Sequence, residues 1–150
     1  MPTPIIRTVT GTSVTRTFAN AVANNAYANI ADALRIQQSA LSTPGLLLCD
    51  FRLTGVSFGT APVAGSVQLA RVSRDAGGTQ GPTPSATLVP REIWTFSPTP
   101  AASNALTGWI MGINGVPLDA DSDYWLFNNG TGYTLATGMV LTGIPWSPGT

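Results

Sequence analysis

The sequence predicts an all-β fold, an antiparallel β-sandwich of jelly-roll type with an extended N-terminal segment. Hydrophobic residues alternate with a period of two along several short runs, and 16 glycines and 12 prolines separate those runs. About eight short strands at a spacing of roughly 10–15 residues, without a convincing long helix, are typical of this architecture. The 150 residues fit one domain. We therefore expect a single sandwich over residues 21–150, preceded by residues 1–20 as an arm or first strand.

The N-terminal segment has strand character from residue 5 to residue 18. Hydrophobic and arginine side chains alternate there, and Gly11 divides the run into one strand or two short ones. Pro2 and Pro4 favour an extended lead-in. An extended terminal segment can add to the sheet edge of a neighbouring molecule, so we expect an anchoring arm. The alternative is that the segment is the first strand of its own sandwich.

The clearest strand covers residues 46–54, where apolar side chains occupy every second position. Pro90 predicts an edge or a break in another run, because proline donates no ladder hydrogen bond. Two runs are apolar on both faces, 105–113 and 123–128, which predicts burial within the sandwich or a subunit interface. Asn128-Asn129-Gly130 predicts a tight hairpin. The further predicted strands are 66–73, 86–96 and 133–144.

The segment 20–41 is ambiguous between helix and strand. Its alanines suit a helix, but its asparagines are poor helix-interior residues, so we favour a strand through 31–37. Residues 74–85 and 97–104 have turn chemistry and almost no bulky apolar side chain, which predicts exposed loops.

Composition excludes several classes of function. The chain has no histidine, no lysine and one cysteine, which removes Ser-His-Asp and Cys-His catalysis, Schiff-base chemistry and most zinc sites. Its formal net charge is zero, without a basic cluster for nucleic acid. No apolar run approaches the roughly 18 residues that span a membrane. We expect no enzyme activity, catalytic residue, metal or cofactor, and neither nucleic acid nor membrane as a partner.

Asp119, Asp121 and Asp123 form the opening of a calcium-loop pattern. Tyr124 stands where that loop needs glycine, and Gly130 stands where it needs a bidentate glutamate. We expect a polar turn, with a weak cation site as the alternative.

Three further patterns have simple structural interpretations. Glu92 is the only glutamate, and no second carboxylate can be paired with it for acid–base work. Asn129-Gly130-Thr131 matches a glycosylation sequon but is interpreted as the hairpin tip. The four tryptophans suggest either packing or sugar stacking, and we expect packing, with Trp146 the most exposed; they are Trp94, Trp109, Trp125 and Trp146.

An ordered set of motifs over residues 46–146 resembles small virion structural proteins of tailed bacteriophages. In such proteins a strand leads to a loop, a Gly/Pro-rich insertion, a turn, an asparagine-rich hairpin and a closing strand. The matching stretches are 64–69 (AGSVQL), 73–79 (SRDAGGT), 113–118 (INGVPL), 123–132 (DYWLFNNGTG) and 135–141 (LATGMVL). The resemblance implies a jelly-roll-like fold, a virion location and no catalytic residues.

The resemblance and the composition together favour a capsid decoration (cement) protein. It would bridge neighbouring subunits of the major capsid protein, as a homo-oligomer for which we favour a trimer. The alternative is a tail-associated receptor-binding module that contacts tail proteins and reads glycans through tryptophan and the Thr/Asn-rich loops. An RNA-binding coat is disfavoured, because only Arg7 and Arg16 lie in the first 20 residues.

Overall fold

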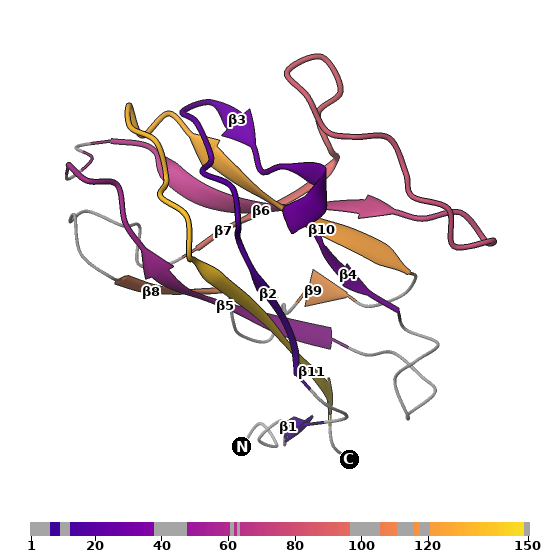
Figure 1. The fold of residues 1–150 in the computed structure, drawn as a ribbon. Helices are drawn as coiled ribbons and strands as arrows, with labels where there is room; N and C mark the ends of the chain where they lie inside the picture. The colour runs from indigo at the N-terminus through magenta and orange to yellow at the C-terminus, as the bar shows by residue number, and fades with distance from the viewer. Residues whose placement is uncertain are drawn as a thin grey trace, which may run out of the picture.

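The computed structural model describes residues 7–9, 13–37, 48–60, 62, 64–96, 106–110, 116–117 and 121–148. These residues form two antiparallel sheets that pack face to face, so the predicted all-β sandwich is confirmed (Figure 1). The described part of the chain holds no α-helix, and its helical element is a single 3-10 turn, η1 (Ile30–Asp32).

The first sheet has the order β1-β11-β5-β8. β2 pairs with β11 beside β1, and β9 pairs with β5 beside β8. Each of these short strand pairs therefore occupies one edge position of a sheet that is four strands wide. Its strands are β1 (Arg7–Val9), β2 (Val14–Thr17), β5 (Leu48–Val56), β8 (Leu106–Ile110), β9 (Val116–Pro117) and β11 (Val140–Pro148).

The second sheet has the order β3-β10-β6-β7, with β4 pairing to β10 beside β3. Its strands are β3 (Ala26–Tyr27), β4 (Leu34–Ile36), β6 (Ser66–Ser73), β7 (Glu92–Thr95) and β10 (Ser122–Asn129). The central pair, β6 and β10, runs in unbroken antiparallel register from Ser66↔Asn129 to Ser73↔Ser122.

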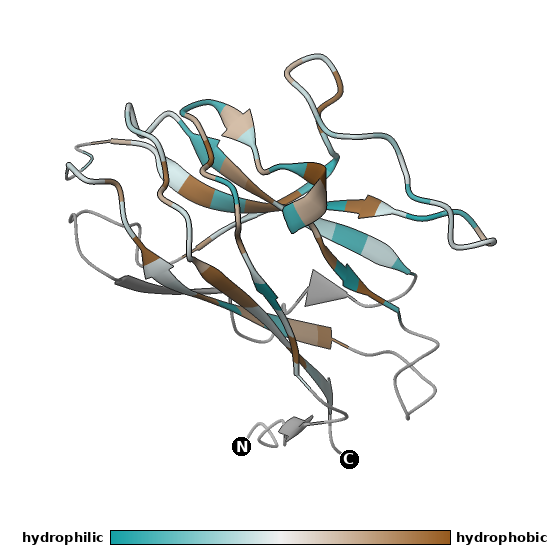
Figure 2. Cartoon of the chain, in the orientation of Figure 1, coloured by the Kyte–Doolittle hydropathy of each residue, from teal (hydrophilic) through white to brown (hydrophobic). Residues whose placement is uncertain are grey.

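The core lies between the two sheets, and the alternation of side chains along the strands builds it. Along β5, Cys49, Phe51 and Leu53 point inward. From the facing sheet, the ring of Tyr124 lies 4.8 Å from that of Phe51 between centroids. Figure 2 shows hydrophobic residues alternating with polar ones along these strands. The predicted strand 46–54 is thus confirmed as β5, shifted by two residues.

The predicted hairpin at Asn128-Asn129-Gly130 is wrong. β10 and β11 belong to different sheets, so the chain crosses the sandwich after Asn129. Gly130 does have a positive φ of 65°, which is the backbone conformation that the motif indicated. The turn leads into a crossover loop, and Leu135 of that loop bridges to Val22.

Buried Asn128 organises this crossover. Its side-chain amide donates to the carbonyls of Val22 (3.0 Å) and Tyr133 (2.7 Å), and its Oδ1 accepts from the Thr131 hydroxyl at 2.6 Å. Asn25 Oδ1 adds a bond from the Gly130 amide at 2.9 Å. The asparagines that argued against a helix over 20–41 therefore hold a turn, and the Thr131 hydroxyl of the sequon is engaged inside the protein.

Three predicted strands are shorter than expected or displaced. In 31–37 the strand is β4, and η1 precedes it. In 86–96 only β7 forms, after the break predicted at Pro90. The closing strand begins at Val140 rather than at residue 133, because residues 133–139 belong to the crossover loop. The loop predicted at 97–104 lies outside the described residues.

The N-terminal segment forms two short strands in the described residues, and both pair with β11 of the same chain. Phe18, directly after β2, is buried in the core. This pairing favours the first-strand alternative over a free anchoring arm for residues 7–18. Residues 1–6, which include the two prolines, lie outside the described residues.

Candidate functional site

The connection between β6 and β7, residues 74–91, carries the most prominent concave feature in the described part of the chain. Arg74 fastens its first turn to the sheet. Its guanidinium lies 2.9 Å from Asp123 Oδ1 and donates to the Gly78 carbonyl at 2.9 Å. Its main-chain amide donates to the Asp121 carbonyl at 2.8 Å. A long loop is thereby fixed against β10 rather than left to move independently.

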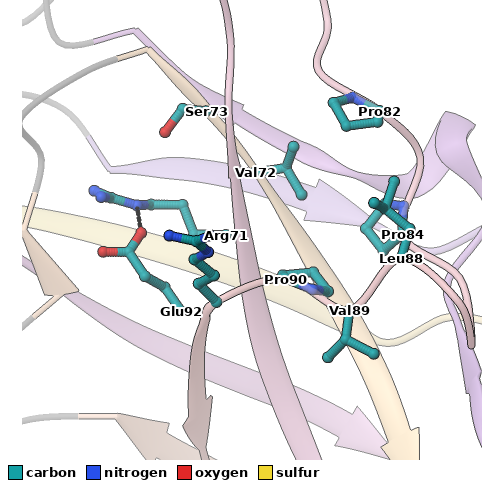
Figure 3. Close-up of a pocket in the computed structure, with 10 residues that line it drawn as sticks. Arg71, Val72, Ser73, Pro82, Pro84, Leu88, Val89, Pro90 and Glu92 are labelled. Atoms are coloured by element: carbon teal, nitrogen blue, oxygen red, sulfur yellow. Dashed lines mark hydrogen bonds and ion pairs between the residues drawn. The ribbon is translucent and has the colours of Figure 1, made fainter.

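Beyond this anchor, the loop encloses an open pocket of about 460 Å³ between itself and the ends of β6 and β7 (Figure 3). The wall that the loop contributes is apolar. Leu88 is 46% exposed and Val89 is 59% exposed, which is unusual for large aliphatic side chains on so small a feature. The pocket is lined by Arg71, Val72, Ser73, Pro82, Pro84, Leu88, Val89, Pro90, Arg91 and Glu92.

The polar side of the pocket is largely neutralised. Arg71, which is buried, pairs through its Nε with Glu92 Oε2, and the two residues face each other across the β6–β7 ladder. Glu92 is therefore engaged with a cation, and no second carboxylate lines the pocket with it. Arg91 is exposed at the same rim. Such a surface favours contact with apolar groups over acid–base chemistry.

The acidic turn is held by arginines. Asp123 is buried and pairs with Arg74, and Asp121 lies 3.5 Å from the guanidinium of Arg35. Arg35 stands opposite Asp123 in the β4–β10 register, a relationship between distant segments that the sequence does not reveal. Asp119 lies outside the described residues, and among those described no cluster of three metal-ligating groups occurs. The two described aspartates act as cross-links between β10, β4 and the loop.

The tryptophans pack. Trp125 is fully buried on the face of β10 that points away from the core, and Trp94 is half-buried against the core. The expectation that Trp146 is the most exposed is wrong. Trp146 is buried, and its indole Nε1 donates to Asp50 Oδ1 at 3.0 Å. Proline and glycine neighbours suggested a loose end, whereas Trp146 belongs to the ordered ladder between β11 and β5. The side chain of Trp109 lies outside the described residues.

Cys49 offers no nucleophile. Its side chain lies in the core, where burial raises the pKa of the thiol far above its ordinary value. The thiol is therefore protonated and shielded at neutral pH.

The sequence was also compared with known proteins. No family model, curated protein or solved structure matches the chain. Among the described residues, no helix is long and apolar enough to cross a membrane.

Proposed function

We propose that the protein is a non-enzymatic structural protein of a tailed-phage particle, a capsid decoration (cement) protein with a jelly-roll fold. It acts in the virion as a homo-oligomer, with a trimer favoured, and bridges neighbouring subunits of the major capsid protein. The mechanism is burial of apolar surface at several contacts at once, which multiplies weak individual affinities.

The strand order supports the jelly-roll assignment. If each pair of short strands that shares an edge position is counted once, the chain has eight strand positions, four in each sheet. Their order is β1/β2-β11-β5-β8/β9 in one sheet and β3/β4-β10-β6-β7 in the other. In this order the last strand of the chain lies between the first strand and β5. Two four-stranded antiparallel sheets with long crossovers are typical of a jelly roll, a fold that recurs in viral capsid proteins.

The apolar pocket beneath the β6–β7 connection is the observation that carries the functional proposal. Its aliphatic side chains are exposed, while the carboxylates of Glu92 and Asp123 are engaged by Arg71 and Arg74. A surface of this kind gains free energy by burial against another protein. With a formal net charge of zero, the chain meets little long-range electrostatic repulsion when many copies assemble.

The glycan-binding alternative has less support. Sugar stacking needs aromatic faces open to solvent, and Trp125 and Trp146 are both buried. The exposed aromatic ring is Tyr133 in the crossover loop, and no second exposed aromatic accompanies it among the described residues. One open ring is a weak platform for a sugar.

The proposal is tested on particles of the phage that encodes the chain, prepared without the protein and then incubated with it. We expect the protein to co-sediment with the particles and to raise the temperature at which they release DNA. Val89→Asp, at the pocket rim, should weaken both effects. Ile30→Asp is the matched control, because Ile30 is a comparably exposed aliphatic residue (49%) outside the pocket lining.

Two outcomes contradict parts of the proposal. Binding to isolated tails but not to capsids would refute the decoration role. Equal loss of capsid binding in both variants would refute the assignment of the contact to the pocket.

A further inference from the structure

The edge of β7 is open in the described part of the chain, where the strand pairs with β6 alone. Its main-chain hydrogen-bonding pattern can be deduced from the ladder. The Phe96 amide donates to the Val67 carbonyl at 3.0 Å, so residues 96, 94 and 92 form the hydrogen-bonded pairs with β6. The amides and carbonyls of residues 91, 93 and 95 therefore point away from β6, toward the open edge.

This edge lacks the features with which proteins protect such edges. Unprotected strands are usually blocked by unpaired charge, by proline or by being very short. The only charged residue of β7 is Glu92, which Arg71 engages. Of the other described edge strands, β2 carries the exposed Arg16, and β3 and β4 have only two and three residues. On β7, Ile93 is 36% exposed.

We propose that β7 pairs antiparallel with β7 of a second copy of this chain, through a twofold axis that passes between the two Ile93 residues. A twofold contact places each residue opposite its own mirror position, so Ile93 faces Ile93 of the partner copy, and residue 91 faces residue 95. The three residues whose main-chain groups point outward are then the three that pair. This register gives about six main-chain hydrogen bonds, two for each of the three facing pairs.

Side chains are compatible with that register. The two Ile93 side chains meet on the outer face, forming a favourable apolar cross-strand pair. Each Arg91 lies opposite Thr95 of the other copy, so the two arginines are about 14 Å apart along the ladder, beyond the screening length of about 8 Å at physiological salt. Pro90, which has no amide hydrogen, falls just beyond the last facing pair and ends the ladder without loss.

The contact does not depend on the proposed virion role. It makes a symmetric dimer, so a trimer would require a different surface. In a particle, the same edge would join copies that sit on neighbouring capsid subunits.

The test is sedimentation velocity on the full chain at micromolar concentrations. We expect a dimer for the wild type, in exchange with a 15.5 kDa monomer on dilution. Ile93→Lys places two like charges across the axis and should weaken dimerisation at least about tenfold. Thr95→Pro removes an outward-pointing amide without touching the β6 ladder, and should have a similar effect. Ile30→Lys, the same substitution at an exposed site on η1, should leave the dimer unchanged.

The thermal transition of each variant reports folding separately from assembly. A wild type that stays monomeric overturns the proposal. So does an oligomer that persists in folded Ile93→Lys or Thr95→Pro at the wild-type affinity, which would indicate another interface.

Discussion

Asp32 is the residue at which a single atom change should reveal how the two sheets are joined. It lies in η1 with its carboxylate buried, and it accepts hydrogen bonds from the amides of Ala19 and Asn20 and from the Asn20 side chain, each at 3.0 Å. Those donors form the bend that follows β2. The carboxylate therefore ties the segment that leaves the first sheet to the segment that enters the second.

Asp32→Asn keeps the shape but presents an NH₂ group where one oxygen accepts. At least one buried donor, and at most all three, then lose a good acceptor. An unsatisfied buried polar group costs about 1–3 kcal/mol, so we expect a loss of about 2–4 kcal/mol in the free energy of unfolding. For a chain of this size, that loss corresponds to a melting temperature lower by roughly 6–16 °C.

The same residue sets a pH dependence. Burial alone would raise the pKa of the Asp32 carboxyl, but the hydrogen bonds from Ala19 and Asn20 and the charge of Arg16 outweigh it, so the pKa lies below the ordinary 3.8. Because the folded pKa is lower than the unfolded one, the stabilisation is complete above the unfolded pKa and is lost as the pH falls through the folded value. The stability difference between wild type and Asp32→Asn should be constant from about pH 5 upward and shrink below about pH 4.

Urea denaturation at a series of pH values measures both quantities. Asp75→Asn is the control, since Asp75 also accepts a main-chain bond, from Thr79, but is exposed in the β6–β7 loop and should change stability far less. A loss of less than about 1 kcal/mol for Asp32→Asn, or a difference that stays constant below pH 4, would refute the reasoning.

Three other perturbations follow from the packing. Gly65→Ala should prevent native folding, because φ is +79° and the new Cβ would lie 2.4 Å from the Asn129 carbonyl oxygen, whereas Gly59→Ala, at φ +71° with open space around it, should cost only about 1 kcal/mol; soluble yield and thermal melting distinguish them, and equal behaviour contradicts the argument. A chain that starts at Ala21 should lose its cooperative thermal transition, since it lacks β2 and the buried Phe18; normal melting would restore the anchoring-arm interpretation. Cys49 should resist alkylation at pH 8 until the protein unfolds, and labelling at the rate of a free thiol would show that the core opens.

The local elements were predictable where the side-chain pattern is set by one strand alone. Residues 66–73 alternate cleanly between small or polar and aliphatic side chains, and β6 has those bounds. Turn residues were also informative at short range. Gly130 adopts the positive φ that its neighbours suggested, yet the direction of the chain after it was not predictable, because either sheet can receive the next strand.

The candidate site was harder to predict, because its residues meet only through pairing between distant segments. Glu92 looked isolated along the chain, and the β6–β7 register brings it to Arg71. Asp121 and Asp123 resembled part of a calcium loop, and the fold supplies Arg35 and Arg74 as their partners. The loop 74–85 was correctly expected between strands, but nothing in its composition indicated that it would be anchored or enclose a pocket.

By itself, the sequence determined the all-β class and the positions of the main strands, because a period of two and glycine or proline punctuation act over a few residues. It also determined which reactive groups are missing, since composition needs no structure. The tertiary structure alone decided the order of the strands, the burial of Trp146 against Asp50, and the partners of each carboxylate. Those features depend on which segments lie side by side, and contacts between residues 96 positions apart, such as Asp50 and Trp146, leave no mark in the local pattern.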